Sequence, residues 1–134
     1  DIVFDWKAML DISGNSGPYL QYTYARLHNI IEKAENRETG YAALLTEPEE
    51  EKLMKKILEF PEAVEHCTER NALNGLALYL YELSNDANRF YESVRVLNDK
   101  DIERRDARVM LISTVSAVLK TGLNLLGMEA PNRI

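Results

Sequence analysis

The residues best suited to binding chemistry lie along one stripe of a helix that the sequence predicts near its start. Tyr19, Tyr22 and Arg26 are spaced by three and four residues. At about 100° per residue, their side chains leave the helix within about 60° of one another. Two aromatic rings and a guanidinium on one face could stack unpaired nucleobases and hold a phosphate group. The apolar positions of the same helix point roughly 120° away, so the predicted core does not need this face.

The same spacing also fits a structural role. Tyrosines on helices often pack against a neighbouring helix or against another domain, and the spacing alone leaves both alternatives open. Tyr91 lies at the edge of a later apolar stripe with Arg95 one turn onward. Taken by itself, Tyr91 fits half-buried packing, and we interpret Tyr79 and Tyr81 in the same way.

Residues with catalytic or metal-binding potential are few and poorly arranged. The histidines are His28 and His66, and Cys67 is the single cysteine. This set cannot build a Cys/His zinc site, and a single cysteine excludes a disulfide within the chain. His66 and Cys67 are adjacent, so on a helix they diverge by about 100° and do not make a nucleophile and base pair. We therefore expect no catalytic centre, no metal and no cofactor in this chain.

The charge of the chain is unevenly distributed. The formal net charge is −6, which by itself disfavours binding to nucleic acid. However, residues 47–69 hold eight Glu and three Lys, and the remainder of the chain is close to neutral. A local basic patch outside this acidic segment therefore stays compatible with the composition.

The first periodic segment predicts an amphipathic helix from Pro18 to about Glu35. Pro18 is suited to the first position of a helix and follows a glycine-containing loop at residues 14–17. Apolar residues then recur at spacings of three and four, which defines a core-facing stripe of Leu20, Tyr24, Leu27, Ile31 and Ala34. Gly40 is the predicted breaker in the linker that follows.

Two shorter helices are predicted in the acidic segment. Thr46 and Glu49 have the spacing of a capping box, in which Thr46 would be the N-cap of a charged helix that runs through Leu58. Pro61 breaks this helix or begins the next, which gives a short helix over residues 62–70.

The two strongest patterns predict long core helices, which completes an all-α bundle of five helices. The first stripe alternates threes and fours over Leu73, Leu76, Leu80, Leu83, Ala87, Phe90, Val94 and Leu97. A turn at residues 98–101 can cap the second helix, whose stripe is Val109, Ile112, Ser116, Leu119, Leu123 and Leu126. Gly127 ends this helix, and Pro131 follows at a distance normal for a helix stop.

The length of 134 residues fits one domain, with residues 1–17 as a junction segment and loop and residues 18–134 as the helical bundle. No apolar run approaches the ~20 residues that would cross a bilayer, so no membrane partner is expected. Residues 1–10 are acidic and mixed, unlike a secretory signal. With the single cysteine, this composition favours a cytoplasmic location.

The run GNSGPYLQYTYAR at residues 14–26 closely resembles the segment that opens the anticodon-binding domain of arginyl-tRNA synthetases. Phe4-Asp5-Trp6 and Met9-Leu10 match the family's approach to that segment. Further pieces follow in the family's order at residues 47–50, 60–62, 78–83, 90–91, 96–97, 105–108 and 126–134. The resemblance therefore covers essentially the whole chain.

The resemblance implies an anticodon-binding domain of the class I synthetase type, which binds the anticodon stem-loop of arginine tRNA. It places Tyr19, Tyr22 and Arg26 on the anticodon-facing helix and Tyr91 at the anticodon pocket. The family usually ends in a Met that contacts the anticodon loop, whereas this chain ends in Ile134. Ile could keep the apolar contact but is stiffer and lacks the thioether. Ser16 in place of the commoner Thr is a smaller departure.

The resemblance also implies a longer parent enzyme that ligates arginine to its tRNA with ATP and Mg²⁺. That chemistry needs a Rossmann-type catalytic domain with HIGH-like and KMSK-like motifs, which this sequence lacks; residues 53–56 do not match the second motif. We therefore expect a chain that binds tRNA without catalysis, as a C-terminal domain that partners its own catalytic domain. The alternative is a helical protein-interaction module of the same ancestry that has lost RNA binding.

Overall fold

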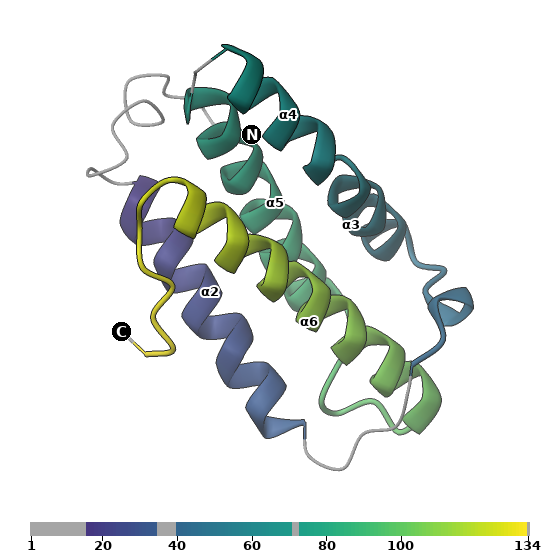
Figure 1. Cartoon of the computed structure of the whole chain (residues 1–134). Helices are drawn as coiled ribbons and strands as arrows, with labels where there is room; N and C mark the ends of the chain where they lie inside the picture. Colours follow the sequence, from purple (N-terminus) through teal and green to yellow (C-terminus); the bar gives the residue numbers. More distant parts are fainter. Residues whose placement is uncertain (1–15, 35–39, 71–72, 134) are drawn as a thin grey trace.

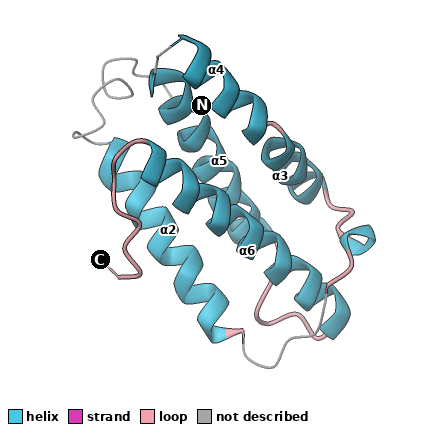
Figure 2. Ribbon diagram, in the orientation of Figure 1, coloured by secondary structure: helices cyan, strands magenta, loops and turns pink. Residues whose placement is uncertain are grey.

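The computed structural model describes residues 16–34, 40–70 and 73–133. Over these ranges the chain forms five α-helices and no strand, which confirms the predicted all-α bundle (Figure 1, Figure 2). The helices are α2 (Ser16–Lys33), α3 (Pro48–Leu58), α4 (Phe60–Arg70), α5 (Leu73–Ser93) and α6 (Ile102–Leu125), with a 3-10 turn at Ala42–Leu44. None of the helices in the described ranges is long and apolar enough to cross a membrane.

Helices α5 and α6 form the centre of the bundle. Helix α5 contacts α2, α3, α4 and α6, and α6 contacts α2, α3 and the 3-10 turn as well. Helices α3 and α4 follow one another along one side of α5, and α2 lies on the other side of the bundle (Figure 1). The acidic α3 and α4 are therefore separated from α2 by the two central helices.

The two long apolar stripes largely occupy the positions that their spacing predicts. The core contains Leu76, Leu80, Leu83, Ala87 and Phe90 from α5, and Val109, Ile112, Ser116, Leu119 and Leu123 from α6, each buried. These helices approach closely at Gly122, where an added Cβ would lie 2.5 Å from a methyl carbon of Leu80. The prediction for α5 is wrong in two respects: Leu73 is exposed, and the helix ends before Val94 and Leu97, although both side chains pack against the core.

At its start, Leu73 is 45% exposed, because it lies at the first residue of α5, beyond the packed part of the bundle. At its other end α5 stops at Ser93, and the chain continues as a loop. Val96 in this loop is buried and Leu97 is half-buried, so their side chains reach the core without helical backbone. The carbonyl of Arg95 accepts a hydrogen bond from the Arg108 guanidinium at 2.7 Å.

The predicted capping box is displaced by one residue. Glu47, not Thr46, is the N-cap of α3, and the carboxylate of Glu50, not Glu49, accepts from the Glu47 backbone N–H at 3.0 Å. The cause is Pro48, which occupies the first helical position and forces the residue before it into extended backbone. That extended geometry is the one an N-cap requires.

The remaining helix ends agree with the prediction within about two residues. Helix α2 begins at Ser16 and includes Pro18 in its first turn, and α4 begins at Phe60 and includes Pro61, where a missing N–H costs no helical bond. In α2 it is Ile30 that is buried, whereas Ile31 is only partly buried against the core.

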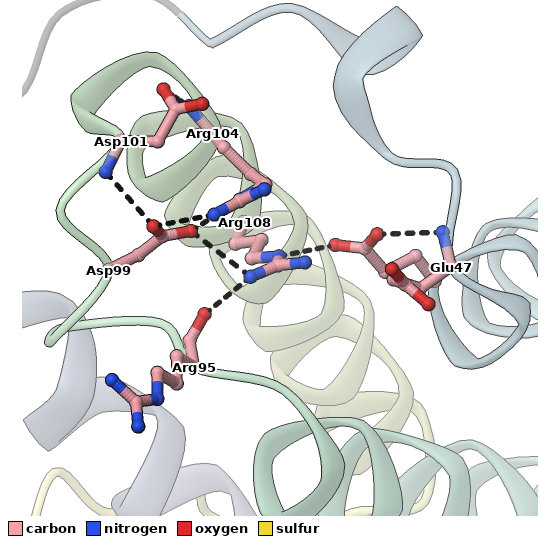
Figure 3. A network of polar contacts seen from close by, with 7 residues as sticks. Glu47, Arg95, Asp99, Asp101, Arg104 and Arg108 are labelled. Carbon is pink, nitrogen blue, oxygen red and sulfur yellow. Dashed lines mark hydrogen bonds and ion pairs between the residues drawn. The ribbon is translucent and has the colours of Figure 1, made fainter.

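A cluster of charges, in which Glu50, Asp99 and Arg108 are buried and Arg104 is exposed, joins the start of α3 to the start of α6 (Figure 3). The Arg108 guanidinium donates to Glu50 at 2.7 Å and to Asp99 at 3.2 Å, and Arg104 donates to Asp99 at 2.5 and 2.9 Å. The side chains of Arg108 and Glu50 are 7% and 1% exposed. The hydrogen bond from Arg104 holds the pKa of the Asp99 carboxyl at about 2, below its usual 3.8. Paired and hydrogen-bonded in this way, these charges fix α3 and the α5–α6 loop on α6.

Candidate nucleic-acid interface

Tyr19, the first residue of the predicted stripe, packs against α5. Its ring centroid lies 5.4 Å from that of Tyr81, and its hydroxyl donates to the Asn85 side-chain oxygen at 2.7 Å. Burial raises the pKa of the Tyr19 hydroxyl above its usual value, so the group stays protonated and able to donate. The ring of Tyr19 therefore packs against a neighbouring helix, as the structural alternative predicts.

Tyr22, the second residue, faces outward. Its side chain is 53% exposed, and it has no hydrogen bond or ring contact to any residue in the described ranges. An exposed aromatic ring on a rigid helix loses little conformational entropy when a flat ligand stacks on it.

Arg26 lies between the exposed surface and α5. Its Nη1 donates to the Asn88 side-chain oxygen at 2.8 Å, and its guanidinium lies 5.2 Å from the ring centroid of Tyr91. Glu92 is a looser partner at 3.8 Å, and 28% of the Arg26 side chain remains exposed. The structure thus brings together two of the predicted site residues from different helices, Arg26 and Tyr91, with donors of Arg26 still open to a ligand.

Asn88 of α5 connects these residues. Its amide nitrogen donates to the hydroxyls of Tyr19 at 3.0 Å and Thr23 at 3.2 Å. Because both amide hydrogens are directed to these oxygens, the amide oxygen points toward Arg26. Asn88 therefore holds the Arg26 guanidinium in place over Tyr91.

A groove of about 680 Å³ runs along the exposed side of α2. Tyr22, Arg26, His28, Asn29 and Glu32 line it from α2, and the chain after α6 supplies the opposite wall. Figure 1 shows this C-terminal segment, in yellow, turning back to run beside α2. The groove therefore joins an aromatic platform, a guanidinium and several hydrogen-bonding groups, which suits a nucleotide better than an apolar ligand.

The opposite wall of the groove consists of Asn132 and Arg133, the last two described residues. Arg133 adds a second guanidinium to the groove, and Asn132 adds an amide that can both donate and accept. Ile134, the residue for which a contact at the anticodon loop was expected, lies outside the described residues.

A second hollow, of about 460 Å³, lies between α3 and α5 and also contains cations. Two of its lysines are already paired: Lys52 lies 3.4 Å from Asp86, and Lys56 lies 2.9 Å from Glu82. Its aromatic residue, Tyr81, is half-buried against Tyr19. The formal charge of its lining is +1, the same as that of the groove on α2, so charge does not separate the two sites. Because the hollow has no exposed aromatic ring, it is a weaker match to single-stranded nucleic acid than the groove on α2.

Comparison with known proteins identifies the family. The family model described as "DALR anticodon binding domain" matches residues 20–134. The chain belongs to this family.

The relatives of this DALR domain are consistent with the family assignment. The chain is 34% identical over 133 residues to a protein named "Arginine--tRNA ligase" of Flavobacterium psychrophilum, covering 99% of this chain and 22% of that protein. It is 40% identical over 138 residues to the protein of the same name in Fusobacterium nucleatum, covering 100% and 24%. The solved structure titled Thermus thermophilus arginyl-tRNA synthetase superposes with a TM-score of 0.82 at 32% identity, covering 98% of this chain and 23% of that one. The DALR domain thus spans less than a quarter of each of these three proteins.

Several residues of the DALR domain's groove were missed from the sequence. Asn88 and Asn85 carry the contacts that link α2 to α5, and His28, Asn29 and Arg133 line the groove. Asn88 lies one helical turn from Tyr91 on α5, but its meeting with Arg26 depends on how α2 and α5 pack. No periodicity within a single helix signals such a contact.

Proposed function

We propose that this DALR domain binds the anticodon stem-loop of an arginine tRNA, with unpaired bases of the loop in the groove between α2 and the C-terminal segment. The observation that carries the proposal is the exposed ring of Tyr22 beside Arg26, whose guanidinium is held over Tyr91 by Asn88. The family membership and the relatives named as arginine–tRNA ligases support the identity of the RNA.

The roles of the groove residues follow from their chemistry. A base splayed out of the loop stacks on Tyr22, and Arg26 and Arg133 reach the phosphates on either side of it. Asn29, which lines the groove, hydrogen-bonds base edges, because an amide both donates and accepts. Tyr19 supports the site from behind through its contacts with Asn88 and α5.

The net charge of −6 does not oppose this proposal, because the acidic residues are concentrated away from the groove. Helices α3 and α4 carry much of the negative charge, and α5 and α6 lie between them and α2. At physiological ionic strength charges about 8 Å apart or more are strongly screened, so the local field depends mainly on the groove's own charges: Arg26 and Arg133, with Glu32 in the lining and Glu92 3.8 Å from Arg26.

We extend the proposal to the parent protein, because the relatives are about four times longer than this chain. The parent would be a cytoplasmic enzyme that ligates arginine to its tRNA with ATP and Mg²⁺. Its catalytic domain lies outside these 134 residues and is a second partner of the bundle. The bundle then contributes tRNA selection and no bond-making step.

The proposal is tested by titrating the chain with a hairpin RNA that carries an arginine anticodon loop, against a hairpin with the same stem and another loop. Tyr22→Ala should weaken binding of the arginine hairpin by about 1–3 kcal/mol, the usual contribution of a stacked base. Tyr41→Ala is the matched control, because Tyr41 is also exposed, at 63%, and lies outside the groove. Equal losses for both variants would contradict the assignment of the groove.

The competing function is a protein-interaction module that has lost RNA binding. It predicts no binding of either hairpin up to about 1 mM, a free energy weaker than about −4 kcal/mol. Discrimination between the two hairpins by the unmodified chain would exclude it.

A further inference from the structure

The C-terminal segment, residues 127–133, leaves α6 in a fixed direction. The Gly127 N–H donates to the Asn124 carbonyl at 3.0 Å and the Met128 N–H to the Leu123 carbonyl at 2.8 Å. Gly127 has a φ of 77°, in the left-handed region that favours glycine. Together these two bonds form a Schellman turn, which ends α6 and reverses the chain toward α2.

Beyond this turn the segment is attached to the bundle in two ways. Met128 and Ala130 pack against the core, which fixes how deep the segment lies. The side-chain amide of Gln21 donates to the Glu129 carbonyl at 3.0 Å. Among the hydrogen bonds of the described residues, this one alone joins α2 to the C-terminal segment.

The place of Gln21 on α2 gives this bond a consequence for the groove. Gln21 precedes Ala25 by one turn and His28 by two turns, so it lies on the same ridge of the helix as residues that line the groove. Asn132 and Arg133, the opposite wall, follow the anchored Glu129 by three and four residues. The anchor point therefore lies close enough along the chain to fix the wall's position and orientation.

We infer that Gln21 is a positioning residue, which holds the C-terminal segment against α2 and so keeps Asn132 and Arg133 in place as a wall of the RNA-binding groove. This inference rests on the proposed function. Gln21 itself acts through the segment, without contacting the RNA. An apolar residue of similar length at position 21 leaves the Glu129 carbonyl without this donor, and the segment then keeps only its apolar contacts.

The test is a double-mutant cycle in the 134-residue chain, read out by affinity for the arginine anticodon hairpin. Gln21→Met keeps the length of the side chain and removes the donor. The second change is deletion of residues 132–134. In the intact chain Gln21→Met should weaken binding roughly two- to tenfold, the range expected for one hydrogen bond. In the shortened chain it should have no further effect, because the wall is already gone.

Amide exchange of residues 128–133 without RNA provides a second readout, which a role confined to RNA contact would not change. It should accelerate in Gln21→Met, while exchange within α2 stays the same. Equal loss of affinity in the intact and shortened chains would overturn the inference, because Gln21 would then act independently of the segment. Unchanged affinity or unchanged exchange would also overturn it. If the unmodified chain binds no hairpin, the proposed function fails. The exchange measurement is made without RNA and still tests whether Gln21 holds the segment, so the two failures are distinguishable.

Discussion

Two arginines of this bundle each bridge separate helices, and their surroundings differ in a way that separates folding from binding. Arg108 is 7% exposed and donates to two carboxylates and a backbone carbonyl. Arg26 is 28% exposed and has one amide partner, a ring beneath it and a carboxylate at 3.8 Å. The Arg108 guanidinium is paired with carboxylates and a carbonyl. The Arg26 guanidinium is held in one orientation and keeps N–H donors that are free to bind a ligand.

The difference fits the proposed division of roles, in which Arg108 stabilises the fold and Arg26 binds RNA. A buried charge must be compensated fully, so the cluster around Arg108 has no capacity for a ligand and contributes to holding α3 on α6. Arg26 is held by a neutral amide and has only a distant, exposed carboxylate at 3.8 Å, so its positive charge is weakly compensated, which suits attraction of a phosphate. We therefore expect substitutions at the exposed part of the α2 face to cost little stability and single substitutions in the α3–α6 cluster to cost more.

The largest expected effect is on stability, from Arg108→Met. This change leaves the Glu50 carboxylate, which is 1% exposed, without its cationic partner. The free energy of unfolding should fall by about 3–5 kcal/mol, the usual cost of breaking a buried pair from one side. Urea denaturation measures it, and the double variant Arg108→Met/Glu50→Gln should recover part of the loss. If the free energy of unfolding decreases by less than about 1 kcal/mol, the Arg108–Glu50 pair contributes no more than a surface ion pair, which would contradict its assigned role.

The next effect is on binding, from Arg26→Met. Affinity for the arginine anticodon hairpin should fall by about 1–3 kcal/mol, and the salt dependence of binding should decrease by about one counterion. The free energy of unfolding should change by less than about 1 kcal/mol, because the side chain is partly solvated and loosely paired.

Arg89→Met is the matched control for this prediction. Arg89 is an exposed arginine of α5 that lines the hollow between α3 and α5. A larger loss of RNA affinity at Arg89 than at Arg26 would move the RNA site from the α2 groove to that hollow.

Asn88→Leu should affect both properties at once. The change leaves the hydroxyl of Thr23, which is 0% exposed, without its Asn88 donor and removes the acceptor for Arg26. We expect a loss of about 1–2 kcal/mol in stability and a smaller loss in RNA affinity. In a cycle with Arg26→Met, the losses in RNA affinity should be less than additive. Additive losses would show that Asn88 does not act through Arg26.

The smallest effect appears only in acid and comes from Asp99. Because its pKa falls to about 2 from 3.8, its carboxylate contributes stability that is complete above pH 3.8 and is lost as the pH falls toward 2. Melting temperature measured over this range should drop less steeply in Asp99→Asn than in the unmodified chain. Parallel curves would mean that another carboxyl carries this acid sensitivity.

The sequence was most informative where a single helix determines the outcome. The periodic stripes of α5 and α6 predicted the core, and Gly127 was predicted to end α6, because these features depend on residues within a few turns of one another. Errors arose where local signals compete. Pro48 moved the N-cap from Thr46 to Glu47, and the end of α5 at Ser93 was concealed by loop residues that are also buried.

The groove was less predictable, because its parts meet only through tertiary packing. Spacing placed Tyr19, Tyr22 and Arg26 on one face, but the structure buries half of that face against α5 and leaves Tyr22 exposed. The contact of Gln21 with Glu129 spans 108 residues of sequence. Such a contact has no signature in the spacing of either segment.

The central claim is that RNA binds at α2 and the C-terminal segment, away from the buried charge cluster. The most direct measurement is an NMR titration of the chain with the arginine anticodon hairpin, followed at each backbone amide. We predict that the signals of Tyr22, Arg26 and Arg133 shift progressively, while those of Glu50 and Arg108 do not. Shifts confined to α3 and its hollow with α5, or no shifts at saturating RNA, would contradict the account.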